Sequence, residues 1–87
     1  MLTKKFVIKN EVGLHARPAA VFVQTVSKYK SKITIEKDGK IANAKSIVEV
    51  LSLGVEKDAE VTITAEGSDE EDAMRAIEKL IESNFGE

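Results

Sequence analysis

The sequence predicts an α+β fold, an open-faced two-layer β-sandwich in which helices cover one face of a four-stranded antiparallel sheet. Four segments alternate apolar with polar residues, as half-buried strands do. Three other segments repeat apolar residues at helical spacing. Because every predicted strand has one polar face, we expect all three helices on the opposite face, in the element order β-α-β-β-α-β-α. Periodicity alone leaves the order of the strands in the sheet open.

The N-terminal segment predicts a strand, a loop and a helix. Residues 2–9 alternate as a strand, and residues 10–15 break the alternation and predict a loop. The apolar face of the strand consists of Leu2, Phe6 and Ile8. From Ala16 the period becomes helical, and we expect this helix to end at about Lys28 or Tyr29. Its apolar stripe consists of Ala19, Phe22, Val23 and Val26.

A hairpin and a short helix are predicted next. Residues 32–36 and 40–43 alternate as strands, and Asp38-Gly39 between them is typical of a tight turn whose residues have positive φ. Ser46 and Glu49 match a capping box, in which the serine caps the helix and the glutamate bonds back to the serine N–H.

The C-terminal segment predicts the fourth strand and the third helix. Residues 61–66 alternate again, and Gly67 ends the strand. Residues 68–71 then open a helix with acidic side chains, which the helix dipole favours at an N-terminus. The buried stripe of this helix consists of Ala73, Ile77, Leu80 and Ile81.

Length and composition exclude several classes of protein. The 87 residues suffice for one domain, predicted over residues 1–87, and 43% hydrophobic with 32% charged residues is typical of a globular domain. The net charge of -2 gives no general reason to expect binding to nucleic acid or membranes. There is no cysteine, signal peptide or membrane span, so we expect a cytoplasmic protein. A lone histidine without soft ligands nearby predicts no metal site, and we expect no cofactor.

His15, the only histidine, stands at the predicted start of the first helix. Backbone N–H groups at a helix N-terminus form an anion site, and Arg17 adds a cation that can fork onto phosphate oxygens. A positive environment favours a neutral, nucleophilic imidazole, which can attack a phosphoryl donor. The spacing therefore indicates phosphoryl chemistry at His15. Taken alone, it also fits a solvated loop histidine or an imperfect helix cap.

The segment Gly13-Leu14-His15-Ala16-Arg17-Pro18-Ala19 resembles the active-site motif of HPr, the histidine-containing phosphocarrier of the bacterial phosphotransferase system. The resemblance covers essentially the whole chain and includes Phe22-Val23-Gln24, Asn43-Ala44-Lys45-Ser46-Ile47 and Leu51-Ser52-Leu53-Gly54. It implies the strand order 1-4-2-3. It also implies that His15 is phosphorylated on Nδ1 by enzyme I, using phosphoenolpyruvate, and that the phosphoryl group passes to sugar-specific IIA proteins. Arg17 and the backbone amide of Ala16 would hold the phosphoryl group.

The resemblance implies a second site at Ser46. In some relatives the matching serine is phosphorylated by an ATP-dependent HPr kinase/phosphorylase, which links the protein to a catabolite-control transcription factor. Here Val48-Glu49 replaces the usual methionine-glycine pair, and Glu49 should oppose an incoming phosphate. Val12 also stands where relatives often carry a polar residue beside the histidine.

The short helix after Ser46 has too many apolar residues to bury them all in a small core, and Gly54 should end it. An exposed apolar patch marks an interaction site, although a fully buried helix is the alternative. The resemblance implies that partners dock on Ile47, Val48 and Leu51, close to His15.

Several alternatives remain at this stage. One is a regulatory paralogue that binds a transcription factor or metabolic enzyme, although the best-known such relative lacks the histidine. Another is a carrier of the nitrogen-related phosphotransferase chain. A nucleic-acid-binding module is disfavoured, because aromatic residues are only 5% of the chain. No paired acid and base or glycine-rich phosphate loop is visible, so we expect a substrate of other enzymes rather than an enzyme. The resemblance implies that one of these is enzyme I, and a carrier that visits several partners through one face is best served as a monomer. The sequence does not identify the sugar or acceptor.

Overall fold

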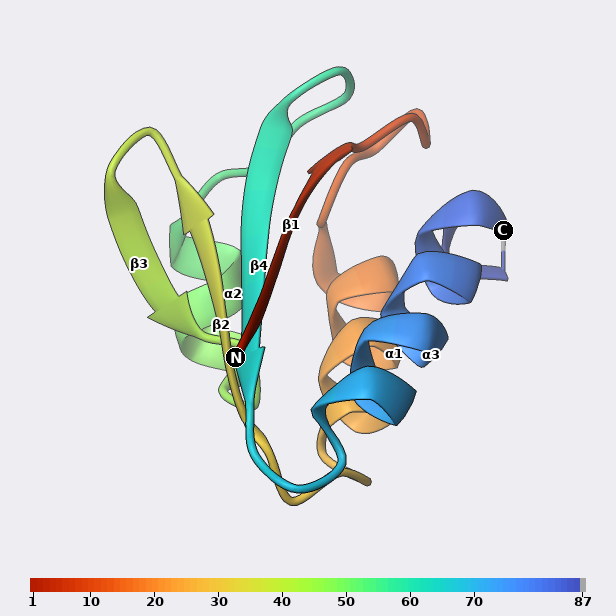
Figure 1. Ribbon diagram of the computed structural model, residues 1–87. Helices are drawn as coiled ribbons and strands as arrows, with labels where there is room; N and C mark the ends of the chain where they lie inside the picture. The colour runs from red at the N-terminus through yellow and green to blue at the C-terminus, as the bar shows by residue number, and fades with distance from the viewer. Residues whose placement is uncertain (87) are drawn as a thin grey trace.

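The computed structural model describes residues 1–86 and contains the predicted four-stranded antiparallel sheet. Its strands are β1 (Leu2–Val7), β2 (Lys32–Lys37), β3 (Lys40–Asn43) and β4 (Glu60–Glu66). They lie in the order β1-β4-β2-β3, which confirms the fold class and the strand order (Figure 1). Glu87, the last residue of the predicted domain, lies outside the described residues.

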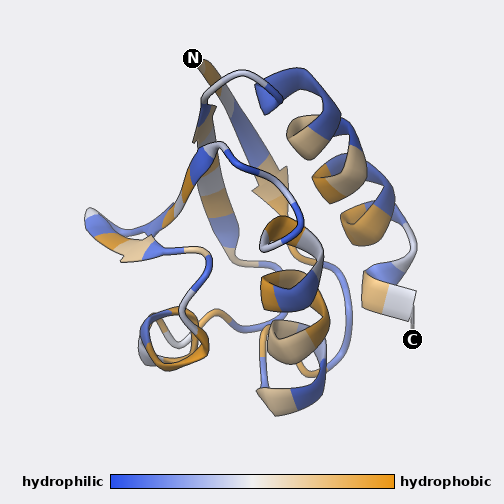
Figure 2. Ribbon diagram, turned by 90° about the horizontal axis from the view of Figure 1, so that it is seen from below, coloured by the Kyte–Doolittle hydropathy of each residue, from blue (hydrophilic) through white to orange (hydrophobic). Residues whose placement is uncertain are grey.

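Three α-helices, α1 (Ala16–Val26), α2 (Ile47–Ser52) and α3 (Glu70–Glu82), cover one face of the sheet. Figure 2 shows the apolar sides of α1 and α3 turned inward, while polar residues occupy the outer side of α3. The predicted stripe of α3 is confirmed, because Ala73 and Ile77 are buried and Leu80 and Ile81 pack against the core. Burial of these side chains supplies the main stabilisation of the two layers.

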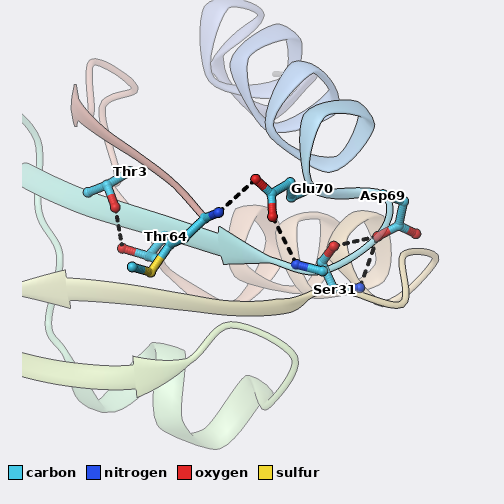
Figure 3. A network of polar contacts seen from close by, with 7 residues as sticks. Thr3, Ser31, Thr64, Asp69 and Glu70 are labelled. Carbon is cyan, nitrogen blue, oxygen red and sulfur yellow. Dashed lines mark hydrogen bonds and ion pairs between the residues drawn. The ribbon is translucent and has the colours of Figure 1, made fainter.

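The alternation predicted for the strands gives the sheet its two faces. Ile33 and Ile35 of β2 and Val61 and Ile63 of β4 are buried beneath the helices. The opposite face carries a row of threonines, in which Thr64 lies across from Thr3 on β1 and from Thr34 on β2. The hydroxyl oxygens of Thr3 and Thr64 are 3.2 Å apart and share a hydrogen bond (Figure 3).

The turn between β2 and β3 and the two ends of α2 form where the local sequence predicts them. Asp38 and Gly39 have φ of 52° and 82°, as the tight turn requires. Gly54 follows the last residues of α2 with φ of 63°, which confirms it as the stop of that helix. The Ser46 Oγ accepts a hydrogen bond from the Glu49 N–H at 3.3 Å, so the predicted N-cap is confirmed.

The predicted end of the first helix near Lys28 or Tyr29 is wrong, because α1 ends at Val26. The next turns tighten: Lys28 N–H donates to Thr25 and Tyr29 N–H to Val26, both three residues back. The chain must turn here to enter β2.

A short 3₁₀ helix, η1 (Asn84–Gly86), was not predicted. It buries Phe85, whose ring meets that of Phe22 edge-on at a centroid distance of 6.5 Å. Asn84 and Phe85 both have positive φ, so tertiary packing overrides local preference at this point.

The turn into β2 is tied to the start of α3 by Asp69. The Asp69 carboxylate accepts hydrogen bonds from the backbone N–H groups of Lys30 and Ser31, at 2.8 and 2.9 Å, and from the Ser31 hydroxyl at 2.5 Å (Figure 3). These donors, the Ser31 hydroxyl above all, lower the pKa of Asp69 below its ordinary value. Beside it, Glu70 accepts from the Gly67 N–H at 3.0 Å and pairs with the N-terminal amine of Met1.

Candidate functional site

His15 is the residue immediately before α1 and occupies the N-cap position. Its backbone is extended, and its exposed side chain makes no capping hydrogen bond. The His15 carbonyl accepts the Ala19 N–H at 2.9 Å and so begins the helical bonding. The imidazole is therefore free to meet solvent or another protein, as the phosphoryl chemistry predicted for it requires.

The amides of Ala16 and Arg17 lie at the open N-terminus of α1. Within residues 1–86, neither N–H donates to a protein acceptor, and Pro18 has no N–H to donate. Pro18 is buried and anchors the first turn. Two unpaired donors thus remain beside His15, and the helix dipole adds partial positive charge at the same end.

Arg17 is exposed and follows His15 by two residues. Across the described part of the chain, it forms no ion pair. Its guanidinium is thus available to an anion held at the helix N-terminus. The structure brings His15, Ala16 and Arg17 together at one helix end, as the sequence predicts.

The loop before His15 is fixed by buried backbone contacts. Gly13 has φ of 59°, and a Cβ atom there would collide with the Val55 carbonyl and lie 2.6 Å from the Cα of Glu56. The next residue, Leu14, is buried and donates its N–H to that same carbonyl at 2.9 Å. The position of His15 is therefore set by close approach of two backbone segments.

Asn10 also holds this loop, and sequence reasoning did not single it out. It is 5% exposed, and its side-chain Nδ2 donates to the Gly13 carbonyl at 2.6 Å. The backbone carbonyl of Asn10 accepts the Gly13 N–H at 3.1 Å. The available signal was an asparagine three residues before a glycine in a predicted loop, a pattern typical of side-chain-stabilised turns.

Two shallow hollows flank His15. One lies between the start of α1 and the end of α2 and is lined by Ala16, Leu51 and Gly54 among others. The second lies on the other side and is lined by Glu11, Val12 and Lys57. Glu56 lines both hollows together with His15 and was not singled out from the sequence.

The charges of the second hollow are partly neutralised. Lys57 Nζ lies 2.9 Å from Glu11 Oε1, and this hydrogen bond raises the pKa of Lys57 above its ordinary value. Glu56 forms no side-chain hydrogen bond or ion pair in residues 1–86. Val12 is 43% exposed, and its side chain offers no hydrogen bond.

The apolar surface of α2 adjoins the first hollow. Val48 is 74% exposed and Leu51 is 40% exposed, whereas Val50 is buried and Ile47 half-buried. The prediction that this helix cannot bury all its apolar residues is thus confirmed. We call Ile47, Val48 and Leu51 the α2 patch.

The C-terminal end of α2 is held from the β2–β3 hairpin. Lys37 Nζ donates to the Gly54 carbonyl at 3.1 Å, and Lys40 Nζ donates to the Ser52 carbonyl at 3.0 Å. Cations suit the last carbonyls of a helix. These bonds set the α2 patch relative to the hollow beside His15.

The predicted hydrogen bond from the Ser46 N–H to the Glu49 side chain is wrong. The Glu49 carboxylate accepts from the backbone N–H of Asn43 at 2.9 Å instead of from Ser46. The Ser46 N–H already donates to the Asn43 carbonyl at 3.0 Å, so it needs no second partner. Glu49 therefore links α2 to the end of β3 and keeps its charge near Ser46.

This fold, with a solvent-exposed histidine at a helix N-terminus, defines a class of small phosphocarrier domains. The model of the PTS-HPr family, described as the PTS HPr component phosphorylation site, matches residues 2–83. The chain belongs to the HPr family, the phosphocarriers of the phosphotransferase system.

Solved structures agree with this assignment. HPr-C-His from Thermoanaerobacter tengcongensis is 56% identical, with a TM-score of 0.97 over 100% of this chain and 98% of that one. The phosphocarrier protein HPr of Bacillus anthracis is 44% identical, with a TM-score of 0.88 over 92% and 95% of the two chains. The catabolite repression protein Crh of Bacillus subtilis is 40% identical, with a TM-score of 0.70 over 99% and 94%, and is described as a dimer with a swapping domain.

Residues 1–86 contain neither a metal-binding cluster nor a membrane-spanning helix. No group of three or more histidine, cysteine, aspartate or glutamate side chains in this range is arranged to hold a metal ion. None of the helices described combines the length and hydrophobicity needed to span a bilayer.

Proposed function

We propose that this protein carries a phosphoryl group on His15, received from phospho-enzyme I and passed to sugar-specific IIA proteins. The observation that carries the proposal is the exposed, uncommitted imidazole at the N-cap of α1 beside the unpaired amides of Ala16 and Arg17. Membership of the HPr family supports it.

The transfer is a displacement at phosphorus. The Nδ1 atom of His15 attacks the phosphorus carried by enzyme I, a nitrogen–phosphorus bond forms, and the bond to enzyme I breaks. The amides of Ala16 and Arg17 and the Arg17 guanidinium offset the negative charge on the phosphoryl oxygens. The same steps in reverse order deliver the group to the acceptor. The protein is thus a substrate of enzyme I and needs no cofactor.

Docking of both partners is assigned to the α2 patch. Ile47, Val48 and Leu51 form an exposed apolar surface next to the hollow beside His15. A donor or acceptor that covers this surface excludes water and brings its own reactive group to His15. A cytoplasmic, monomeric single domain suits a carrier that presents one face to successive partners.

Regulation at Ser46 is a second proposal for the same chain. Ser46 caps α2, and a phosphate at this position adds charge beside the α2 patch without needing a new backbone conformation. An HPr kinase/phosphorylase and a catabolite-control transcription factor are the corresponding partners. The similarity to Crh favours a regulatory role as the alternative function, whereas the presence of His15 favours the carrier.

The test is phosphorylation by enzyme I and phosphoenolpyruvate, comparing the native chain with His15→Ala and, as a control, Ser46→Ala. We expect one acid-labile phosphate on the native chain and on Ser46→Ala, and none on His15→Ala. Phosphate on the His15→Ala variant would refute the assignment. A folded native chain that takes no phosphate from an enzyme I of its own organism would favour the regulatory alternative.

A further inference from the structure

Glu56 is an uncompensated negative charge that lines the same hollows as the proposed phosphoryl acceptor, His15. It lines both hollows that flank His15, and no hydrogen bond or ion pair engages its carboxylate in the described residues. The neighbouring cation, Lys57, is already paired with Glu11 at 2.9 Å. The side chains that line the two hollows therefore bring net negative charge to the surroundings of His15.

The backbone holds Glu56 in this place. The Glu56 Cα lies against Gly13, where even one added carbon atom would be too close at 2.6 Å. The adjacent Val55 carbonyl accepts the Leu14 N–H at 2.9 Å, and the Glu56 carbonyl accepts the Ala59 N–H at 3.1 Å. Glu56 and His15 are thus on two segments that cannot move apart without breaking buried contacts.

We propose that Glu56 shortens the lifetime of the phosphoryl group on His15 and so favours its onward transfer. The inference rests on the proposed function and deepens it. The amides of Ala16 and Arg17 attract the phosphoryl oxygens, whereas the Glu56 carboxylate in the lining of the adjacent hollows repels them. A carrier gains from this balance, because a phosphoryl group held too firmly is not passed on.

The exposure of Glu56 limits how strongly its charge changes the lifetime of the phosphoryl group. Glu56 is exposed, so water and salt screen its field. For one exposed like charge we expect the neutral variant Glu56→Gln to lengthen the lifetime about two- to threefold at low salt. The repulsion model also predicts that Glu56→Lys lengthens it further, because the sign of the interaction reverses.

The experiment installs the phosphoryl group with phosphoramidate, so it needs no partner protein. The His15 nitrogen attacks phosphorus, the phosphorus–nitrogen bond of phosphoramidate breaks, and ammonia leaves. The loss that follows is hydrolysis: water attacks phosphorus, the bond to His15 breaks, and inorganic phosphate is released. Mass spectrometry follows the phosphorylated fraction with time at about 20 mM and about 500 mM salt.

The matched control is Glu71→Gln. Glu71 is also an exposed glutamate, and it lines a hollow that contains neither His15 nor Glu56. At low salt we expect the longest phosphoryl lifetime for Glu56→Lys, a shorter one for Glu56→Gln and the shortest for the native chain. The lifetime of Glu71→Gln should equal that of the native chain, and high salt should reduce all the differences. Thermal unfolding of each variant confirms that the fold is kept.

The outcomes separate this inference from the proposed function. Equal lifetimes for Glu56→Gln and the native chain, a shorter lifetime, or a difference that salt does not reduce would overturn the role of Glu56 and leave His15 as carrier. Failure of phosphoramidate to label His15, under conditions that label free imidazole, would overturn both.

Discussion

At the scale of single residues, Gly13 decides where His15 lies. Its positive φ and its contact with the 55–56 backbone allow the loop to pass so close that no side chain fits. The sequence identifies Gly13 as part of a loop, but the close approach arises from a segment 42 positions further along the chain, between Gly13 and Val55. Local pattern cannot reveal such a contact.

Replacing Gly13 with alanine should lower the free energy of unfolding by about 2–4 kcal/mol, because left-handed backbone strain and steric overlap add. The matched control is Gly39→Ala, which has φ of 82° but open space around the new carbon. Gly39→Ala should lower the free energy of unfolding by about 1 kcal/mol. Urea unfolding of both variants measures the difference. Equal losses would show that the contact with Val55 and Glu56 relaxes freely.

Asp69 gives a prediction for pH dependence. Its pKa is lowered in the folded state by the Ser31 hydroxyl and by the backbone N–H groups of Lys30 and Ser31. A lowered folded pKa contributes stability above the ordinary value of 3.8, and this contribution is lost as the pH falls through the folded pKa.

Asp69→Asn should therefore have a lower melting temperature than the native chain at about pH 7, and this difference in melting temperature should be smaller at about pH 2.5. Thermal unfolding followed by circular dichroism at both pH values measures the difference. A gap of the same size at both pH values would mean that the ionised carboxylate is not the source of the stabilisation.

At the scale of elements, α2 has a structural role, and we propose a recognition role for it as well. Val50 on its inner side is buried, and the outer residues form the α2 patch. Lys40 bonds to the carbonyl of its last residue, Ser52, and Lys37 bonds to the Gly54 carbonyl just beyond the helix. Because Val48 is 74% exposed, it contributes little to the core, and its apolar surface is available to partners.

Val48→Ser should change the free energy of unfolding by less than about 0.5 kcal/mol but slow phosphoryl transfer from enzyme I about tenfold, through weaker docking. Ile41→Ser is the matched control, because Ile41 is 66% exposed on β3 and is outside the α2 patch. Rates of phosphorylation at limiting enzyme I compare the two. Equal slowing by both variants would remove the special role of α2.

Glu49 gives the corresponding prediction for Ser46. Its carboxylate accepts the Asn43 N–H and adds a negative charge in the turn of α2 that Ser46 caps. Glu49→Gln keeps an acceptor for Asn43 and removes the charge, so a cognate HPr kinase should phosphorylate Ser46 about threefold faster. Glu49→Gly should also be faster, at a further cost in helix stability of about 1 kcal/mol. An unchanged rate for both would discard charge repulsion.

At the scale of the whole molecule, the periodicity of the sequence predicts the strands, the helices and the one-sided layering. The strand order followed from family resemblance, because alternation shows which face is buried and not which strands are neighbours. The helix around Phe85 is not visible in the sequence because it depends on the Phe22–Phe85 contact between segments distant in the sequence. The partner of Glu49, Asn43, is only six residues away, but the Ser46 N–H that the capping box would use is already bonded to the Asn43 carbonyl.

In the candidate site too, local sequence predicts some residues, whereas others depend on contacts with another segment of the chain. His15, Ala16 and Arg17 are consecutive, so the start of α1 places them side by side. Asn10 acts within the loop, where an asparagine three residues before a glycine is a local signal. Glu56 reaches the site only through the packing of the loop on the segment before β4, which no local motif indicates.

The most direct test of the central claim is phosphorus and backbone-amide NMR of the protein phosphorylated by enzyme I and phosphoenolpyruvate. We expect a phosphohistidine signal that correlates with the His15 ring, with the largest amide shifts at Ala16 and Arg17. A phosphoryl group on any other residue, or unchanged amide resonances at Ala16 and Arg17, would contradict it.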